Sequence, residues 1–331
     1  MSGRKNIVLY GRPVIGRADW LSAALDPSWT VTAIDYTAST EDKTRVFADA
    51  DAVVCVRYNG EVPPAPRLRL VQVPGVGTDE IDNAALPGAA TLCNVRGHGP
   101  GAAEFVILQM LEWRQRSRDA EASFRSGSWE ASSRFGAPPR GELFSATVTL
   151  IGYGEIGRAI ADRLEPFGVS LRVANRSPLP DADRFECTGR LDQVGDLVEG
   201  ADFAVVCIAL TAETIGLIGG EVLSRLGPEG VVINVARGPV VDEKALFEAL
   251  SEGRLGGAVI DVWYRYPEAD DPDQSPANHP FATLSNVVMT PHISGWTKGT
   301  VDRRWADILT NLDRLGEGGG FINVVRPAQS S

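Results

Sequence analysis

Positive charge is in short supply in this sequence of 331 residues. Lys and Arg number 32 against 43 Asp and Glu, which gives a formal net charge of −11 at pH 7. Nucleic acids and anionic membranes are bound through basic faces, so this charge argues against either as a bulk partner. It still allows a small anionic ligand, which a few local arginines can hold. Long hydrophobic runs are missing as well. Residues 203–210, one of the longest apolar stretches, reach only the length of a strand and are far too short to span a membrane.

Cysteine and histidine are also scarce, with four and three residues. The cysteines are widely spaced, and three of them lie in apolar or strand-like stretches, which favours free, buried thiols over disulfides or a metal site. We therefore expect no metal ion. No hydrophobic signal segment precedes the strand-like residues 7–10, so we expect a cytoplasmic protein. The four cysteines are Cys55, Cys93, Cys187 and Cys207.

Short apolar stretches alternate with helical ones along the chain, with no fixed-period repeat. This alternation predicts parallel sheets with right-handed crossovers, in two doubly wound α/β domains of Rossmann-like or flavodoxin-like type with a cleft between them. A break near residues 98–101 separates the two series, and helices are expected at 18–25, 41–47, 81–85, 102–116 and 300–315. The expected strands are 7–10, 31–34, 52–56, 70–73 and 91–94, then 147–151, 171–174, 203–208, 231–234, 257–261 and 287–289.

A glycine-rich turn follows the predicted strand 147–151 and opens a helix. The turn reads Gly152-Tyr153-Gly154-Glu155-Ile156-Gly157. In a dinucleotide-binding turn the first glycine permits the tight bend, the second lets the backbone approach the pyrophosphate, and the third lets the helix pack on its strand. The pyrophosphate then lies on free N–H groups at the positive end of the helix. Strand, turn and helix together predict a nicotinamide dinucleotide site here.

The end of the second strand bears on the choice between NAD and NADP. NAD-binding turns usually carry an acidic residue there for the ribose 2′-hydroxyl, and this chain has Asn175-Arg176-Ser177 instead. Asn175 and Ser177 can donate hydrogen bonds, and Arg176 can pair with a 2′-phosphate while stacking on adenine. We expect NADP(H), with NAD(H) left open because Arg176 can also stack on adenine in an NAD enzyme.

Beyond this turn the chain resembles the D-isomer-specific 2-hydroxyacid dehydrogenase family over nearly its whole length. The resemblance implies a discontinuous substrate domain of residues 1–98 plus 290–331, with a dinucleotide-binding domain of residues 99–289 inserted. It also implies a homodimer formed through the cofactor domain. The matching segments are residues 71–79, 152–157, 232–238 (Val-Ile-Asn-Val-Ala-Arg-Gly), 259–262 and 290–292 (Thr-Pro-His).

The resemblance implies roles for individual residues. Arg237 would grip a 2-oxo acid by its carboxylate and carbonyl, which suits the fixed donors and permanent charge of a guanidinium. His292 would be the general acid, protonating the carbonyl oxygen as hydride reaches the carbon, because imidazole titrates near neutrality. Val76 and Gly77 would bind the substrate carboxylate through backbone N–H groups. Asp261 would hold the nicotinamide carboxamide.

Further residues are expected at these sites with less specific roles. Arg57 occupies a loop that touches substrate in some relatives, and His98 lies at the expected hinge, so both are candidate substrate-binding residues. The remaining cofactor-binding candidates that the resemblance implies are Ala209, Leu210, Thr214, Val235, Ala236 and Gly295.

The sequence departs from the family's pattern at Tyr266. The family places a glutamate there, five residues after Asp261, to orient the histidine and stabilise its protonated form. Tyrosine can offer one hydrogen bond but no charge near pH 7. Three interpretations stay open: slower reduction at neutral pH with Tyr266 as the catalytic partner of His292, replacement of the carboxylate by Glu268, or a pocket reshaped for an unusual substrate.

The function expected from these residues is hydride transfer between a nicotinamide cofactor and a small 2-oxo acid or D-2-hydroxy acid, as in glyoxylate or hydroxypyruvate reduction. The partner would be a small anionic substrate. Two alternatives remain: oxidation of an unusual small anion, and a dinucleotide-sensing scaffold of the same fold with little turnover, which the missing glutamate leaves open.

Overall fold

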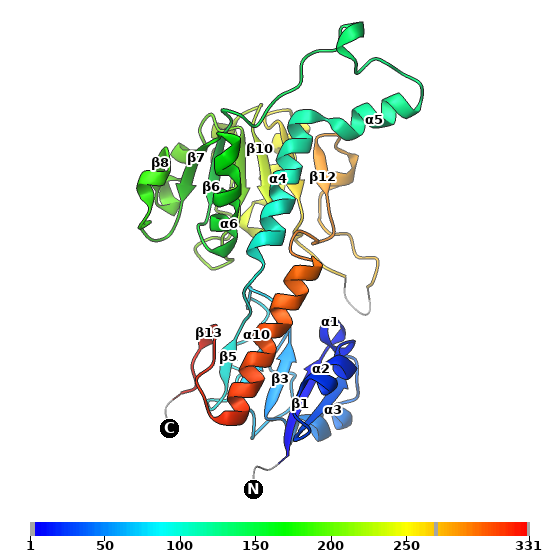
Figure 1. Ribbon diagram of the computed structural model, residues 1–331, viewed down its shortest axis with the longest axis vertical. Helices are drawn as coiled ribbons and strands as arrows, with labels where there is room; N and C mark the ends of the chain where they lie inside the picture. Colours follow the sequence, from blue (N-terminus) through cyan, green and yellow to red (C-terminus); the bar gives the residue numbers. More distant parts are fainter. Residues whose placement is uncertain (1–3, 268–270, 330–331) are drawn as a thin grey trace. The chain divides into compact units, whose positions relative to one another are not determined.

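The computed structural model describes residues 4–267 and 271–329 and divides the chain into two compact units (Figure 1). The first unit comprises residues 1–97 and 298–331, and the second comprises residues 98–297. Each unit is built on its own largely parallel sheet with helices packed against it. The predicted α/β class with two parallel-sheet domains is confirmed.

The first unit has the strand order β2-β1-β3-β4-β5-β13, in which only β13 is antiparallel. The order of the first five strands is the flavodoxin-like one. β3 and β4 are buried along their whole length, as expected for central strands of short apolar sequence. The strands are β1 Lys5–Tyr10, β2 Trp29–Ile34, β3 Ala52–Cys55, β4 Leu70–Gln72, β5 Thr91–Cys93 and β13 Val324–Arg326; the helices are α1 Arg12–Ile15, α2 Ala18–Ala24, α3 Thr40–Phe47 and α10 Lys298–Glu317.

The C-terminal helix α10 belongs to the first unit because a buried polar network joins it to the sheet. Asn311 donates to the side-chain oxygen of Gln72 at 2.7 Å, and the Gln72 amide donates to the carbonyl of Asn94 at 2.9 Å. Asn311 also exchanges two hydrogen bonds with the backbone of Ile322, which leads into β13. Both amide side chains are fully buried, so each hydrogen bond offsets a desolvation cost of about 1–3 kcal/mol.

The second unit has the strand order β12-β11-β10-β9-β6-β7-β8, all parallel. This is the Rossmann order with one more strand at the end, and its direction reverses between β6 and β9. The strands are β6 Thr147–Ile151, β7 Ser170–Ala174, β8 Cys187–Gly189, β9 Phe203–Val206, β10 Val231–Asn234, β11 Gly257–Ile260 and β12 Val287–Met289. The α-helices are α4 Gly99–Gln115, α5 Ser117–Arg125, α6 Glu155–Leu164, α7 Val194–Val198, α8 Gly220–Leu226 and α9 Glu243–Ser251.

Helix α4 is joined at its start to α6. The backbone N–H of Gly99 donates to the carboxylate of Glu155 at 2.8 Å, and a Cβ on Gly99 would lie 3.1 Å from that of Ala159. The 3₁₀ turns of this unit are η1 Ser133–Phe135, η2 Glu165–Phe167, η3 Ala182–Arg184, η4 Leu191–Gln193, η5 Gly238–Val240 and η6 Phe281–Thr283.

Helix α5 and the segment after it extend beyond the sheet of the second unit (Figure 1). α5 buries none of its residues, and three aromatic side chains that follow one another along this arm are exposed: Phe124 (55%), Trp129 (55%) and Phe135 (68%). Their ring centroids are 4.9 and 6.2 Å apart in sequence order. We call residues 117–141 the arm.

Several local expectations differ from the structure. The helix predicted at residues 81–85 is wrong: Ile81 forms a β-bridge with Tyr58, because the Tyr58 carbonyl accepts from the N–H of Asp82 at 2.8 Å. Strand β8 has no counterpart in the sequence prediction. Residues 290–297, expected to return to the first domain, cluster with the second unit, since the carboxylate of Asp261 binds the backbone of residues 293 and 294.

The cysteines are all free thiols, and Cys55 and Cys93 are buried as expected, while Cys187 on the outer strand β8 is exposed. Within residues 4–267 and 271–329, no cluster of His, Cys, Asp or Glu is suited to a metal ion. In the same residues, no helix combines the length and the apolar character that crossing a bilayer requires.

Candidate active site

Four candidate groups of the second unit lie at one edge of its sheet. All strands of a parallel sheet end on the same side, so the turns that follow them meet there. The glycine turn at residues 152–157 follows β6, Arg237 follows β10, Asp261 follows β11 and His292 follows β12. Since β6, β9, β10, β11 and β12 are neighbours in that order, these turns form a row along the carboxyl edge.

The three glycines of the turn meet three different requirements. Gly152 has a φ of +104°, and a Cβ there would lie 2.9 Å from the Cα of Ile208. At Gly157 a Cβ would lie 2.4 Å from the carbonyl oxygen of Gly152, so only glycine lets α6 pack this closely on the turn. A Cβ at Gly154, the residue that caps α6, would meet no protein atom within 4 Å. The middle glycine therefore leaves open space at the helix N-terminus, where a pyrophosphate fits.

A hollow of about 550 Å³ lies beside this turn, where the strand order reverses between β6 and β9. Seven of the predicted cofactor residues line it: Gly152, Tyr153, Gly154, Asn175, Arg176, Ala209 and Thr214. Its other lining residues are Leu191, Cys207, Ile208, Thr211 and Glu213. Of the remaining candidates, Glu155, Ile156, Gly157, Ser177 and Leu210 adjoin this lining in the chain, whereas Val235, Ala236, Asp261 and Gly295 lie farther along the edge.

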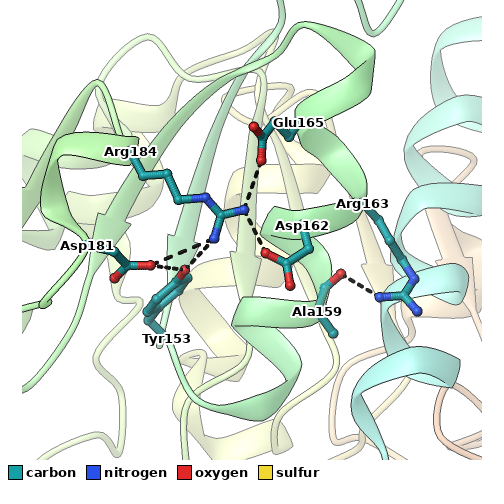
Figure 2. Close-up of polar contacts among 7 residues, drawn as sticks. All are labelled: Tyr153, Ala159, Asp162, Arg163, Glu165, Asp181 and Arg184. Carbon is teal, nitrogen blue, oxygen red and sulfur yellow. Dashed lines mark hydrogen bonds and ion pairs between the residues drawn. The ribbon is translucent and has the colours of Figure 1, made fainter.

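Tyr153 is held by an ionic network behind the turn (Figure 2). The residue is 3% exposed, and its hydroxyl donates to Asp181 at 2.9 Å and accepts from Arg184 at 3.2 Å. Arg184 also binds Asp162 at 2.6 Å and Glu165 at 3.0 Å, both from helix α6 or its end. Burial and the hydrogen bond to Asp181 raise the pKa of Tyr153. The network thus joins the segment after β7 to α6. The hydroxyl of Tyr153 takes part in it through its hydrogen bonds to Asp181 and Arg184.

Polar side chains brace the loops around the hollow. Asn175 accepts from the N–H of Tyr153 at 3.2 Å and donates to the carbonyl of Ser177 at 3.0 Å. Thr214 is 2% exposed and joins the backbone of Thr211 to that of Ala209 through its hydroxyl, at 2.8 Å each. The amide of Asn175 therefore shapes its own turn, which leaves Arg176 as the charged group of this segment at the hollow.

Cys207 lies beneath the glycine turn. Its thiol donates to the carbonyl of Gly152 at 3.1 Å, and burial raises its pKa to about 12. The thiol stays protonated at physiological pH, so its contribution is a weak hydrogen bond and not a nucleophile.

Arg237 is positioned by a residue that the sequence analysis did not single out. Asn234, buried at the end of β10, donates to the carbonyl of Arg237 at 3.0 Å and accepts from the N–H of Ala236 at 3.1 Å. A Cβ on Gly238 would lie 2.4 Å from the carbonyl oxygen of Trp263, so the turn is also packed closely against the segment after β11. A polar residue closing an otherwise apolar strand was the signal for this role in the sequence.

Asp261 is fully buried and organises the turn that carries His292. Its carboxylate accepts from the hydroxyl of Thr290 at 2.6 Å and from the backbone N–H groups of Ile293 at 2.8 Å and Ser294 at 2.9 Å. Hydrogen bonds to a charged acceptor contribute about 1.5–3 kcal/mol each, which offsets the burial of the charge. His292 itself has a φ of +58°, a strained conformation for a residue with a Cβ. The buried carboxylate holds this strain in place.

Tyr266 reaches the ring of His292. The tyrosine oxygen lies 3.0 Å from Nδ1 of the histidine, and the backbone N–H of Trp263 donates to the same oxygen at 3.2 Å. Tyr266 is 43% exposed. The tyrosine thus makes a hydrogen bond at the ring nitrogen, whereas Glu268 lies outside the described residues.

The first unit carries three of the substrate-binding candidates. Arg57 follows β3 and donates to Glu80 at 3.2 Å. Val76 is 42% exposed and follows β4, and its carbonyl accepts from Asn94 at 2.7 Å, which fixes the loop that also contains Gly77. The three candidates therefore follow adjacent strands of that unit's own sheet, which is the carboxyl edge where ligands of such folds bind.

His98 belongs to the second unit. It caps the N-terminus of α4 and is 9% exposed. A Cβ on Gly295 would lie 3.2 Å from the Cδ2 of His98, so the histidine packs beside the end of the His292 turn.

Comparison with known proteins identifies the family. Residues 107–294 match the model of the D-isomer specific 2-hydroxyacid dehydrogenase NAD binding domain. A glyoxylate reductase of Thermofilum pendens is 33% identical over 274 residues, which are 80% of this chain and 77% of that protein. A D-3-phosphoglycerate dehydrogenase of Mycobacterium leprae is 32% identical over 85% of this chain, and the match spans 52% of that protein, so this chain corresponds to about half of its length.

A solved structure extends the likeness to the whole fold. The NADPH-dependent glyoxylate/hydroxypyruvate reductase of Sinorhizobium meliloti, in complex with NADP and malonate, has a TM-score of 0.81 and 28% identity over 99% of both chains. The present chain belongs to the D-isomer specific 2-hydroxyacid dehydrogenase family. It is an NAD(P)-dependent oxidoreductase that acts on CH–OH groups.

The glycine turn offers a paired test of cofactor binding. Gly154→Ala adds a methyl group where no protein atom lies, so we expect unchanged stability and cofactor affinity at least tenfold weaker, because the methyl fills the space of the pyrophosphate. Gly157→Ala places its methyl against a carbonyl at 2.4 Å, and we expect a loss of about 1–3 kcal/mol of stability. Urea unfolding and fluorescence titration with NADPH measure both quantities. Equal cofactor affinity of Gly154→Ala and wild type would contradict this assignment.

Proposed function

We propose that this protein reduces a small 2-oxo acid, such as glyoxylate or hydroxypyruvate, to the D-2-hydroxy acid with NADP(H). The observation that carries the proposal is the row of turns at the carboxyl edge of the second sheet. It holds a glycine turn suited to a dinucleotide, then Arg237, then the His292–Tyr266 pair. A cofactor site, a permanent cation and an acid–base group in one row match what hydride transfer to an anionic carbonyl compound requires.

Arg237 would bind the substrate carboxylate and polarise its carbonyl group. A guanidinium offers several N–H donors in a fixed plane, and the Asn234 hydrogen bonds to its turn reduce the motion of its backbone. Val76, Gly77, Arg57 and His98 are proposed as further substrate-binding residues. When bound, the nicotinamide supplies the hydride, and Asp261 is proposed to hold its carboxamide.

His292 would supply the proton. Its Nε2–H is given to the carbonyl oxygen while the carbon receives the hydride, and the product is the neutral alcohol with its carboxylate unchanged. Nδ1 keeps its proton and donates a hydrogen bond to the oxygen of Tyr266, which lies 3.0 Å away. Tyrosine thereby selects the tautomer and aims the ring, but it adds no negative charge to stabilise the imidazolium.

NADP(H) is proposed over NAD(H) because Arg176 lines the hollow without an acidic residue beside it in the segment after β7. A carboxylate at that place would repel a 2′-phosphate. The related S. meliloti reductase, which is NADPH-dependent, supports the same choice.

The reaction is tested by following NADPH oxidation at 340 nm with glyoxylate, hydroxypyruvate, pyruvate and 3-phosphohydroxypyruvate. We expect turnover with the two small acids, a loss in kcat of about 10²–10⁴-fold in His292→Asn, and a loss in kcat/KM of about 100-fold or more in Arg237→Gln. NADPH affinity should stay unchanged in both variants. Tight NADPH binding without turnover on any acid would instead favour a dinucleotide-sensing protein, and turnover restricted to the phosphorylated acid would contradict the proposed substrate class.

The role of Tyr266 is tested by the pH dependence of reduction. The rate falls where His292 loses its proton, so Tyr266→Glu, which places a negative charge beside the imidazolium, should move this falling limb to higher pH. Tyr266→Phe removes only one hydrogen bond and should lower kcat by a few-fold to about tenfold. The control Tyr264→Phe, a neighbouring half-buried tyrosine, should leave the profile unchanged. A limb that does not move in Tyr266→Glu but shifts in Glu268→Gln would assign the partner role to Glu268.

We also propose that the protein is a homodimer in which the arm of the second unit is covered by a second copy. Three exposed aromatic side chains on a segment with no core beneath it are typical of a protein–protein interface.

Light scattering during size-exclusion chromatography tests the dimer. The measured mass of the wild type should be twice the chain mass of 35.4 kDa. In the double variant Trp129→Ala/Phe135→Ala the measured mass should shift towards that of a single chain. Phe167→Ala, an exposed aromatic of the same unit outside the arm, serves as the control. A wild-type mass of one chain, or a dimer unaffected by the double change, contradicts the proposal.

A further inference from the structure

We propose that Arg190 is a specificity-determining residue that recognises the 2′-phosphate of NADP(H) together with Arg176. The inference rests on the proposed function for its choice of NADP(H) and adds a residue that no sequence motif of the chain marks. Arg190 follows the end of strand β8 and lines a hollow at the cofactor edge, where the neighbouring polar side chains already have hydrogen-bond partners.

Strand β8 brings Arg190 to the cofactor edge. β7 and β8 are parallel, and Ala174 pairs with Gly189, so both strands end at the same level. The N–H of Asn175 donates to the carbonyl of Gly189 at 3.0 Å, which extends the contact between the two segments by one residue beyond the end of β7. Arg176 and Arg190 therefore leave two adjacent strands at one edge, although 14 positions separate them in the sequence.

Both arginines line a second hollow of about 680 Å³. Its lining is Arg176, Arg190, Leu191, Asp192, Glu213 and Leu217, and Arg176, Leu191 and Glu213 also line the hollow beside the glycine turn. The two hollows are thus contiguous, and the second lies past the end of β7, on the side away from β6. The ribose that carries the 2′-phosphate is expected at the end of this strand in a Rossmann domain.

The backbone of Arg190 is fixed while its guanidinium keeps donors for a ligand. The N–H of Arg190 donates to the side chain of Gln193 at 2.9 Å, at the start of η4. The guanidinium is near Asp192, but their closest N–O distance is 3.8 Å, which is longer than a hydrogen bond. The Arg190 side chain is 73% exposed, so a phosphate dianion can approach it from solvent.

Other polar side chains between β7 and β9 already bind protein groups. Arg184, the third arginine between β7 and β9 near the hollows, is bound by Asp162, Glu165 and the hydroxyl of Tyr153 (Figure 2). The amide of Asn175 holds its own turn. Arg176 and Arg190 are then the cations at the second hollow, and a phosphate between two guanidinium groups is a strong charge-assisted arrangement.

Two carboxylates, Asp192 and Glu213, line the same hollow and act against the phosphate. Removing the charge of Glu213 should therefore strengthen NADPH binding. If Glu213 instead held the ribose 2′-hydroxyl of NAD, its removal would weaken NADH binding, so the two roles predict different outcomes.

The experiment measures dissociation constants for NADPH, NADH and 2′,5′-ADP by fluorescence and calorimetric titration of the full chain. In Arg190→Ala we expect NADPH and 2′,5′-ADP to bind roughly ten- to a hundredfold more weakly, with NADH unchanged. Arg190→Lys should recover part of the loss, Arg176→Ala should show the same selectivity, and Glu213→Gln should bind NADPH a few-fold more tightly. Arg254→Ala, an exposed arginine paired with Glu252 on the same unit, is the matched control.

Unchanged NADH affinity also shows that the variant is folded. Equal weakening of NADPH and NADH in Arg190→Ala, or no weakening of either, overturns the assignment of Arg190 while the wild-type preference for NADPH stands. A wild type that binds NADH at least as tightly as NADPH overturns the proposed cofactor choice itself. Weaker NADH binding in Glu213→Gln overturns the inference in favour of an NAD ribose site.

Discussion

Parallel pairing of the strands of the second sheet is the constraint on which the rest of the site depends. Because every strand ends at the same edge, turns far apart in the sequence are brought into one row: the glycine turn after β6, Arg237 after β10, Asp261 after β11 and His292 after β12. The strand ends bring these groups to one edge, and side-chain hydrogen bonds then fix the individual turns. The strand order matters as well, because its reversal between β6 and β9 leaves room for the hollow beside the glycine turn.

Within this row, individual side chains act on the backbone of the next group. The buried carboxylate of Asp261 binds two N–H groups beside His292 and holds that residue at a φ of +58°. Asn234 fixes the turn of Arg237 by donating to the carbonyl of Arg237 and accepting from the N–H of Ala236. Both are charged or polar groups buried at strand ends, where an unsatisfied group would be costly, so the same hydrogen bonds stabilise the fold and orient the side chains of the proposed reaction. Preorganisation of this kind lowers the cost of reaching the transition state.

The contact between Tyr266 and His292 illustrates how a hydrogen bond can orient a histidine ring without adding a charge beside it. The tyrosine oxygen lies 3.0 Å from Nδ1 of the histidine. A hydroxyl can orient the ring through that nitrogen, but orientation and charge stabilisation are separate effects, and only the first is available to tyrosine near neutral pH. Under the proposed function, His292 is therefore oriented by a partner that carries no charge.

The sequence by itself determined the alternation of strands and helices, the glycine turn and the family, because these depend on local periodicity and on spacings within a few residues. It also indicated Tyr266, by counting from Asp261. Tertiary structure alone decided what long-range contacts make: the bridge of Ile81 to Tyr58 in place of a helix, the attachment of residues 290–297 to Asp261, and the short outer strand β8. β8 has three residues and little apolar pattern, so only its pairing with β7 reveals it, and with it the place of Arg190 beside Arg176.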